Sequence, residues 1–99
     1  MQLLKLFSIV RGDLSRSQKG VQAGHAVAQL LLFGDKQSWD NGTLVYLKAP
    51  DETSLQERYE QLVGLGYEVH KFYEPDIGNQ LTAIAALGID EHVKDLPLL

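Results

Sequence analysis

The sequence predicts one α/β domain in which helices cover a four-stranded mixed β-sheet, with the elements in the order β-α-β-α-β-β. Stretches rich in aliphatic and β-branched residues alternate with stretches whose apolar residues recur at helical spacing. The 99 residues suffice for one compact domain, residues 1–99, and no stretch resembles a linker that would divide it. Apolar residues make up 44% of the chain and charged residues 22%, which is typical of a protein with a folded core.

The first part of the chain predicts a strand followed by a helix. Residues 3–10 are mostly aliphatic and predict a buried strand. After a polar connection, Ser17 is the expected N-cap of a helix from Gln18 to Phe33 that ends at Gly34. Apolar side chains lie almost all round this helix, so we expect it to be largely buried. They include Val21, Val27, Ala28 and Leu31.

A second strand and helix follow a polar loop. Residues 43–48 predict a short strand, and either Asp51 or Thr53 is expected to cap the next helix. The inner stripe of this helix is predicted from the spacing of Leu55, Tyr59, Leu62 and Val63. Gly64 and Gly66 are expected to end the helix, because glycine disfavours helix continuation.

The last third of the chain predicts two strands and an irregular tail. Residues 67–73 and 81–87 read as strands, and the polar segment 74–79 as the turn between them. We expect these two strands to form an antiparallel hairpin. The two strand–helix–strand units predict parallel strand pairs with right-handed crossovers. From Gly88 onward we expect a loop with at most one helical turn.

Composition excludes several kinds of site. The chain has no cysteine, which excludes disulfides, thiolate zinc sites, iron–sulfur clusters and a thiol nucleophile. The three histidines show no metal-ligand spacing, and we expect neither a metal nor a cofactor. No segment reads as a signal peptide or as a membrane span, so we expect a cytoplasmic protein without a membrane partner.

Charge is distributed unevenly along the chain. The net charge of −4 and pI near 5.2 argue against binding nucleic acid by bulk attraction. Residues 1–36, however, hold five basic and two acidic side chains, a net charge of +3, whereas residues 37–99 carry −7. Arg11, Arg16 and Lys19 flank the first strand-to-helix connection. A helix N-terminus beside such residues favours an anion, although an ordinary solvated loop is the simpler interpretation.

The first helix carries a polar line on an otherwise apolar background. Gln22, His25 and Gln29 lie at helical spacing on one face. Gly24 lies beside them, although glycine inside a helix costs about 1 kcal/mol relative to alanine. This glycine suits close approach by a strand or a ligand. The alternative is that Gly24 serves helix–sheet packing and that His25 is a semi-buried, hydrogen-bonded histidine.

The segment between the last two strands concentrates carboxylate, carboxamide and hydroxyl groups. If the third strand runs parallel to the first, Glu74 and Asp76 lie on the same edge of the sheet as Arg11, across a cleft. A carboxylate near cationic groups has a lowered pKa and can orient a water or a lysine. The alternative is a hairpin turn in which these residues supply only turn geometry.

Five stretches together resemble the type 2 peptidyl-tRNA hydrolase family. They are Val10-Arg11-Gly-Asp13-Leu14, Lys19-Gly-Val-Gln22-Ala-Gly-His25-Ala26, Leu47-Lys-Ala-Pro-Asp-Glu-Thr-Ser-Leu55, Asp76-Ile-Gly78 and Ala86-Leu-Gly-Ile89. The resemblance covers nearly the whole chain. It implies a three-layer fold, a homodimer, and hydrolysis of the ester that links a peptide to the terminal ribose of tRNA.

The resemblance also implies roles for particular residues. Lys19, Gln22, His25 and Asp76 match the residues that line the family's cleft. Because of two departures, the chain resembles a compact, divergent member of the family. The connection before His25 is shorter and has one lysine where the family has two. The family's threonine after Asp-Ala-Gly is missing at its usual offset, and Thr82 is the candidate to replace it.

These observations define the expected site and its partner. The expected catalytic residues are Lys19, His25 and Asp76. The expected substrate-binding residues are Arg11, Asp13, Arg16, Gln22, Glu74, Asn79 and Thr82. The expected partner is tRNA or a phosphate-bearing nucleotide end. One alternative is a catalytically inactive module that binds or sequesters such an end, and another is a protein-interaction module that uses the acidic second half.

Overall fold

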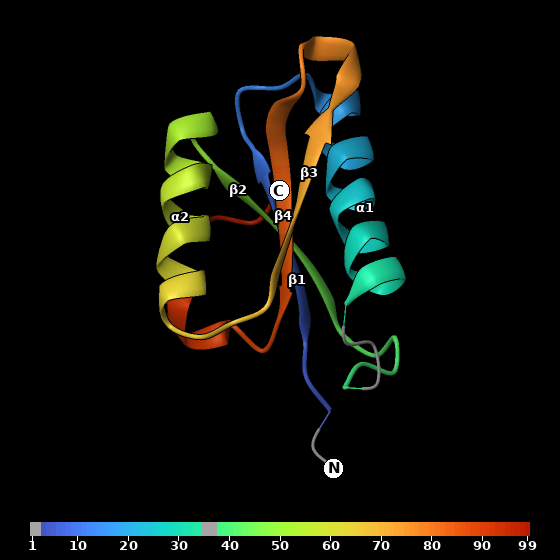
Figure 1. The fold of residues 1–99 in the computed structure, drawn as a ribbon, viewed down its shortest axis with the longest axis vertical. Helices are drawn as coiled ribbons and strands as arrows, with labels where there is room; N and C mark the ends of the chain where they lie inside the picture. Colours follow the sequence, from blue (N-terminus) through green and yellow to red (C-terminus); the bar gives the residue numbers. More distant parts are fainter. Residues whose placement is uncertain (1–2, 35–37) are drawn as a thin grey trace.

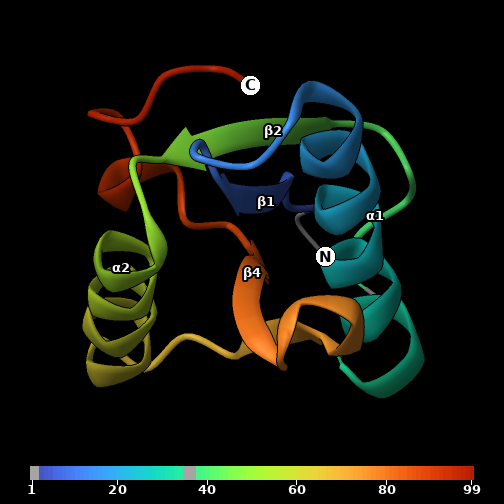
Figure 2. The same ribbon diagram turned by 90° about the horizontal axis from the view of Figure 1, so that it is seen from above.

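Four strands form one mixed sheet, and two long helices cover its opposite faces (Figures 1 and 2). The computed structural model describes residues 3–34 and 38–99. The elements are β1 (Leu6–Arg11), α1 (Arg16–Phe33), β2 (Leu44–Ala49), α2 (Glu52–Gly64), β3 (Val69–Glu74), the short 3-10 helix η1 (Pro75–Ile77), β4 (Gln80–Leu87) and the short 3-10 helix η2 (Asp90–His92). The predicted order is confirmed. Asp35 and Lys36 of the predicted polar loop lie outside the described residues.

The strand order is β2-β1-β4-β3. β1 pairs in parallel with β2, and β4 lies antiparallel to both β1 and β3, so the predicted hairpin is confirmed. β2 and β3 do not form the second parallel pair that the sequence predicted, because β1 and β4 lie between them. β1, β2 and β3 therefore end at one edge of the sheet, the carboxyl edge, where α1, α2 and η1 begin (Figure 2).

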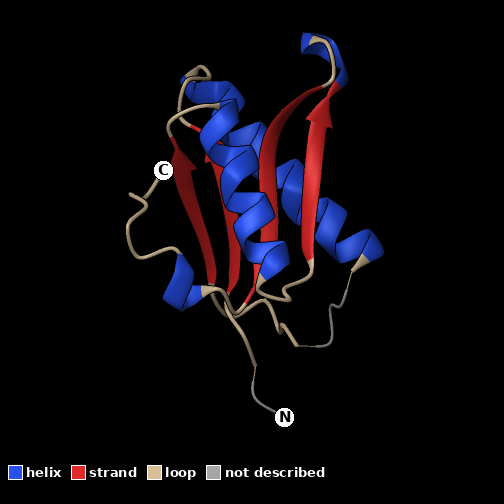
Figure 3. Ribbon diagram, turned by 60° about the vertical axis from the view of Figure 1, so that its left-hand side comes forward, coloured by secondary structure: helices blue, strands red, loops and turns tan. Residues whose placement is uncertain are grey.

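Large aliphatic and aromatic side chains fill the space between the sheet and α2, which crosses in front of the strands in Figure 3. Leu55 and Leu62 of α2 are fully buried, as predicted, and Tyr59 is partly buried. Val63 is 44% exposed, so its assignment to the inner stripe was wrong. It lies one position, about 100°, round the helix from Leu62, which turns it away from the sheet.

Smaller side chains fill the space between the sheet and α1. The buried cluster there consists of Leu6, Val10, Ala23, Ala26, Val27, Leu30, Ala83 and Ala85. The expectation that α1 is largely buried was wrong. Val21, Leu32 and Phe33 are 51%, 69% and 73% exposed. The helix contacts the sheet along one side only, and none of the described elements covers its other side.

Side-chain caps fix where both helices begin. The cap of α1 is Ser15, not Ser17: its backbone is extended, and its Oγ accepts a hydrogen bond of 3.3 Å from the Gln18 amide. Ser17 lies inside the first turn instead. Asp51, one of the two expected caps of α2, accepts a hydrogen bond of 2.8 Å from the Ser54 amide. The earlier start places Arg16 in the first turn of α1, which has no acidic residue.

The C-terminal segment extends the sheet beyond β2. After η2, which is the predicted helical turn, the chain returns to the outer edge of β2. The Lys48 amide donates to the Pro97 carbonyl at 3.1 Å, and the Leu99 amide donates to the Tyr46 carbonyl at 3.0 Å. The outer edge of β2 is therefore partly paired by the chain's own tail, which protects it from pairing with other strands.

Candidate functional site

The predicted site residues come from the segments that meet at the carboxyl edge of the sheet and from the first half of α1. The connection after β1, the first turns of α1, the end of β3, η1 and the start of β4 supply them (Figure 2). The expectation that Glu74 and Arg11 share an edge is confirmed, because β1 and β3 both run antiparallel to β4. Contacts divide these residues into two groups, one around Gln22 and one around Arg11.

Gln22 joins three elements through its side-chain amide. It is 1% exposed on the inner side of α1. Its Oε1 accepts a hydrogen bond of 2.7 Å from Thr82 Oγ1, and its Nε2 donates to Glu74 Oε1 at 2.9 Å. Nε2 also donates to Gln18 Oε1 at 3.1 Å. We call Gln18, Gln22, Glu74 and Thr82 the Gln22 network. It fixes the position of α1 against β3 and β4.

A β-bulge turns Thr82 toward α1. Phe72 pairs with Ala83 and Tyr73 with Leu81, so the register shifts and Thr82 is left opposite no residue of β3. A bulge places two successive side chains on the same side of the sheet, and Ala83 belongs to the cluster under α1. Thr82 is fully buried, and its hydroxyl also lies 3.3 Å from the Phe72 carbonyl oxygen. That Thr82 takes the role of the family's threonine stays a prediction.

Arg11 forms the second group. Its Nε and Nη2 donate to the two carboxylate oxygens of Asp13 at 2.9 and 3.0 Å, and its Nη1 donates to Gln80 Oε1 at 2.8 Å. The hydrogen bonds from Arg11 hold the pKa of Asp13 below its usual value, and the same contact raises the pKa of Arg11. The side chain of Arg11 is only 11% exposed. Its charge therefore serves an internal contact, which argues against the predicted phosphate-binding role.

Arg16 and Lys19 place positive charge at this edge that no described carboxylate neutralises. Both lie in the first turns of α1, Arg16 exposed and Lys19 half-buried. Neither forms an ion pair with a carboxylate in the part of the chain that the structure describes. The free amides of a helix N-terminus add to this positive potential.

Asp76 and Asn79 lie in the exposed turn between β3 and β4. Asp76 makes no hydrogen bond or ion pair with a described residue. The Asn79 amide donates to the Glu74 carbonyl at 2.9 Å, and its φ of 58° is the left-handed conformation that asparagine tolerates. Asn79 therefore has the turn role that the alternative interpretation gave it. Among the described residues, no hydrogen bond, ion pair or ring contact joins Asp76 to Lys19 or His25.

His25 is exposed and stacks on Phe72 of β3. The ring centroids lie 4.3 Å apart with the planes 7° from parallel. The alternative of a semi-buried, hydrogen-bonded histidine was wrong. Of the two reasons expected for Gly24, close approach by a strand was wrong, and close approach by a ligand stays a prediction. The nearest described atom outside the helix is the Tyr46 hydroxyl, 4.0 Å from where a Cβ of residue 24 would be.

Sequence reasoning missed three residues at this edge. Gln18 contacts Gln22, Gln80 contacts Arg11, and Glu52 accepts a hydrogen bond of 2.8 Å from the Leu81 amide. The position of Gln18, one turn before Gln22, is a signal that could have predicted its contact. The contacts of Gln80 and Glu52 depend on how β4 packs beside β1 and α2. No local sequence pattern predicts that packing.

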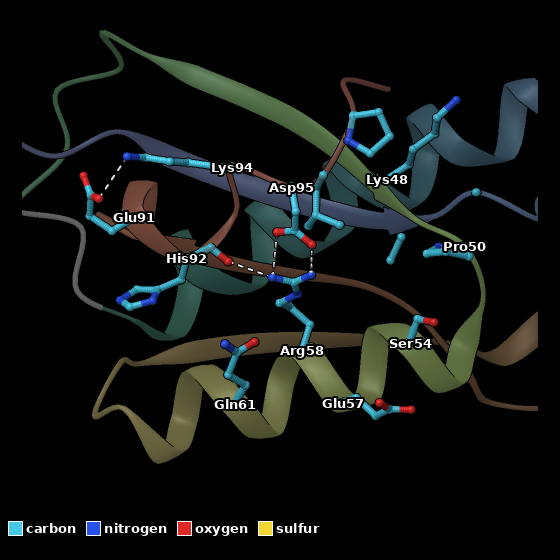
Figure 4. A pocket seen from close by; sticks show the side chains of 14 residues that line it. Lys48, Pro50, Ser54, Glu57, Arg58, Gln61, Glu91, His92, Lys94 and Asp95 are labelled. Carbon is cyan, nitrogen blue, oxygen red and sulfur yellow. Dashed lines mark hydrogen bonds and ion pairs between the residues drawn. The ribbon is translucent and has the colours of Figure 1, made fainter.

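A large pocket lies on the other side of the sheet. It has a volume of about 1160 Å³ and lies between α2, the end of β2 and the C-terminal segment (Figure 4). Arg58 spans it, donating to Asp95 at 2.6 and 3.1 Å and to the His92 carbonyl at 2.8 Å. None of the predicted site residues lines it. The predicted cleft between the basic connection and the acidic turn is not this pocket.

No group of three histidine, cysteine, aspartate or glutamate side chains in residues 3–34 and 38–99 is placed to hold a metal ion. No helix in the same residues is both long and apolar enough to cross a membrane.

Comparison with known proteins shows the fold alone. No family model and no curated protein matches the sequence. Among solved structures, the chain is similar to a protein of unknown function, Atu0240, from Agrobacterium tumefaciens str. C58, with a TM-score of 0.72 and 14% sequence identity. The match covers 100% of this chain and 99% of that one. The arrangement of strands and helices described above therefore also occurs in a protein of different sequence.

Proposed function

We propose that the chain hydrolyses the ester between a peptide and the 3′ end of tRNA, at the carboxyl edge of β1 and β3. The observation that carries this proposal is the Gln22 network. Gln22, Glu74 and Thr82 are far apart in the sequence and meet through hydrogen bonds of 2.7 and 2.9 Å. Buried polar groups held this way fix the position of α1 and with it that of Lys19 and His25. The resemblance assigns Gln22 to the substrate cleft, and because its side chain is 1% exposed we assign it a positioning role there.

Charge supports a phosphate-bearing substrate at the same edge. Arg16 and Lys19 lie on the first turns of α1, beside the helix amides. Together they would hold one or two phosphates of an RNA end. The rest of the chain is acidic, so we expect recognition of a single RNA end and weak binding to RNA in general.

The proposed reaction uses water as the nucleophile. The Asp76 carboxylate takes a proton from a water molecule that Lys19 and His25 help to position, and the water oxygen attacks the ester carbonyl. The bond to the ribose oxygen then breaks, and that oxygen takes the proton back from Asp76 and leaves as the free hydroxyl of tRNA. The peptide leaves as a carboxylic acid. Lys19 also stabilises the negative charge that develops on the carbonyl oxygen.

Release of free tRNA from a peptidyl-tRNA tests this proposal. We expect the purified protein to accelerate release, and Asp76→Asn or Lys19→Ala to slow it by about 100-fold or more, the usual contribution of an acid–base group. Glu57→Gln removes an exposed carboxylate on α2 by the same chemical change and serves as the control. Release by the wild type that is no faster than release by Asp76→Asn would overturn the catalytic assignment.

A binding module without catalysis is the second candidate. It is favoured by Asp76, which no described residue positions, and by the internal pairing of Arg11 with Asp13. For this candidate we expect tRNA or a nucleotide to stabilise the protein by roughly 2.7 kcal/mol at about 100 times its Kd, and to do so equally in Asp76→Asn. Thermal unfolding with and without each ligand measures this effect, and stabilisation without ester cleavage would favour the binding module.

A further inference from the structure

Residues 95–99, which we call the tail, lie along the outer edge of β2 as a short antiparallel addition to the sheet (Figure 2). Two backbone hydrogen bonds hold the tail there, from the Lys48 amide to the Pro97 carbonyl and from the Leu99 amide to the Tyr46 carbonyl. Peptides of other proteins bind to the edge of a sheet in the same way. The tail therefore shows what kind of segment this edge accepts, and in which direction.

The tail uses this edge incompletely. In an antiparallel ladder, a pair in the position of Lys48 and Pro97 normally exchanges two hydrogen bonds, but Pro97 has no amide hydrogen to donate to the Lys48 carbonyl. Alternate residues of β2 point outward, so Leu44 lies on the same edge beyond the last hydrogen bond of the tail, and it is 44% exposed. Leu98 is 70% exposed and buries little apolar surface. A longer segment without this proline would form more hydrogen bonds than the tail does.

The pocket beside α2 adds a charged contact to the tail. The Arg58 side chain reaches from α2 across the pocket to both carboxylate oxygens of Asp95, at 2.6 and 3.1 Å (Figure 4). The His92 carbonyl accepts a hydrogen bond of 2.8 Å from the same guanidinium group and helps to fix it. The side chain of Arg58 is 18% exposed and that of Asp95 is 64% exposed. An ion pair with one exposed partner is weak, so a carboxylate from another chain can replace Asp95.

The charges and the size of the pocket favour such a carboxylate. Lys48 lines the pocket at the end of β2 and forms no ion pair with a carboxylate in residues 3–34 and 38–99. When Asp95 leaves, the charged side chains that line the pocket are three positive and two negative ones: Lys48, Arg58 and Lys94 against Glu57 and Glu91. The volume of about 1160 Å³ is open with the tail in place. It is as large as pockets that hold whole small molecules, roughly 300–1,000 Å³, so it has room for further side chains.

We propose that the outer edge of β2 and the adjoining pocket bind an extended segment of another protein in place of the tail. The segment runs antiparallel to β2 and begins with an acidic residue whose carboxylate binds Arg58. Strand-forming residues follow, without proline at the position of Pro97, and continue past Leu44. The tail competes for this edge, so only a segment that forms more contacts than the tail displaces it.

A peptide that copies and extends the tail gives the main test. The fluorescein-labelled peptide Lys-Asp-Leu-Val-Leu-Leu-Thr-Val-Thr, the Asp peptide, has the sequence of residues 94–99 with valine in place of Pro97. Its last three residues extend the pairing past Leu44. Fluorescence anisotropy measures its binding to the wild type. A second peptide with asparagine in place of the aspartate, the Asn peptide, should bind about fivefold more weakly, the upper range for a partly exposed ion pair.

Variants of the pocket test which side chain recognises the carboxylate. In Arg58→Gln the Asp and Asn peptides should bind equally well. Lys94→Gln is the matched control, because it removes a positive charge from the same pocket and should keep the preference for the Asp peptide. The preference does not depend on competition from the tail, since both peptides displace the same tail. A preference that persists in Arg58→Gln would overturn the assignment to Arg58.

Weakening the tail should strengthen binding. Asp95→Asn removes the ion pair of the tail and frees Arg58, so this variant should bind the Asp peptide up to about fivefold more tightly than the wild type does. Absence of binding to both the wild type and Asp95→Asn up to ~1 mM, the weak limit of specific association, would refute the proposal.

A disulfide can lock the tail in place, because the chain has no cysteine of its own. Leu47 and Leu98 are opposite each other between the two hydrogen bonds of the tail. Residues so placed have Cα atoms about 4.5 Å apart, a separation that a disulfide spans. In the Leu47→Cys, Leu98→Cys double variant, the reduced form should bind the Asp peptide and the oxidised form should not. Equal binding by the two forms would mean that the peptide binds elsewhere, against the proposal.

The outcome of these measurements is independent of the proposed ester hydrolysis. None of them uses a tRNA substrate, and none of the predicted catalytic or substrate-binding residues lines the pocket. The Asp95→Asn and Lys94→Gln variants should therefore release tRNA from a peptidyl-tRNA as fast as the wild type does.

Discussion

The two faces of the sheet are built from different materials. Against α2, the buried cluster is entirely apolar and contains large side chains such as Phe7, Ile9 and Leu62. Against α1, alanines predominate at the centre, and Ser8, Gln22 and Thr82 are buried among them. Apolar burial stabilises in proportion to the area removed from water. The α2 face is therefore built mainly for stability, whereas the α1 face gives up apolar area for polar groups in fixed positions.

Hydrogen bonds offset the cost of burying polar groups on the α1 face of the sheet. Ser8 Oγ donates to the Ala23 carbonyl at 2.9 Å, and the Gln22 network satisfies the other buried groups. Within the described residues, every buried side-chain nitrogen or oxygen has a partner. A buried polar group without a partner costs about 1–3 kcal/mol. Such a network therefore favours the one register of α1 on the sheet in which every group is paired. That register sets where Lys19 and His25 lie.

The largest expected effect breaks the α2 face. Leu62→Ala removes a fully buried side chain from the large apolar cluster and should lower the free energy of unfolding by about 2–5 kcal/mol. Val63→Ala, at the next position, changes a side chain that is 44% exposed and should stay within about 0.5 kcal/mol. Urea unfolding measures both variants. Equal losses would contradict the assignment of Leu62 to the inner side and Val63 to the outer side of α2.

The next effect breaks the α1 face at its polar centre. Thr82→Val keeps the shape but leaves Gln22 Oε1 without its 2.7 Å donor, and should cost about 1–3 kcal/mol of unfolding free energy. Gln22→Leu should cost a similar amount, because Glu74 loses its donor and the Thr82 hydroxyl loses its 2.7 Å acceptor, keeping only the Phe72 carbonyl at 3.3 Å. The double variant should lose less than the sum, since both ends of the 2.7 Å hydrogen bond are then apolar.

Thr53→Val gives a control for this pair, because Thr53 is exposed on α2. We expect it to change stability by less than about 0.5 kcal/mol. A double-mutant cycle in which Thr82→Val and Gln22→Leu are additive would mean that the Gln22 network adds no coupling. The contrast between the two faces would then reduce to a difference in side-chain size.

The order of the elements could be predicted because it depends on local periodicity and on turn residues. The exposure of Val21 and Leu32 could not, since a helix that is apolar all round reads the same whether another element covers it or not. Thr82 was a candidate from its position after the turn, but its direction depends on a bulge. One inserted residue reverses the facing of every residue beyond it. Ser15 and Ser17 are chemically equal caps, and only the backbone distinguishes them.

The smallest effect compares the ion pairs of the two sides. Arg11 lowers the pKa of Asp13 at the carboxyl edge, and Arg58 lowers the pKa of Asp95 beside α2. A carboxyl group whose pKa is lower in the folded than in the unfolded protein stabilises the fold. This stabilisation is fully present at pH values above the ordinary pKa of an aspartate, 3.8. This stabilisation is lost as the pH falls through the lowered value. Asp13→Asn should therefore destabilise the protein near neutral pH and make little difference in strong acid.

The Asp13→Asn and Asp95→Asn variants should lose different amounts of unfolding free energy. The side chain of Asp13 is 41% exposed and that of Asp95 is 64% exposed, so water screens the second pair more. We expect Asp13→Asn to cost less than about 1 kcal/mol near neutral pH, and Asp95→Asn to cost less than Asp13→Asn. Urea unfolding of both variants between about pH 7 and about pH 2 measures the two losses. A larger loss for Asp95→Asn would mean that the Arg58–Asp95 ion pair stabilises the fold more than the Arg11–Asp13 ion pair does.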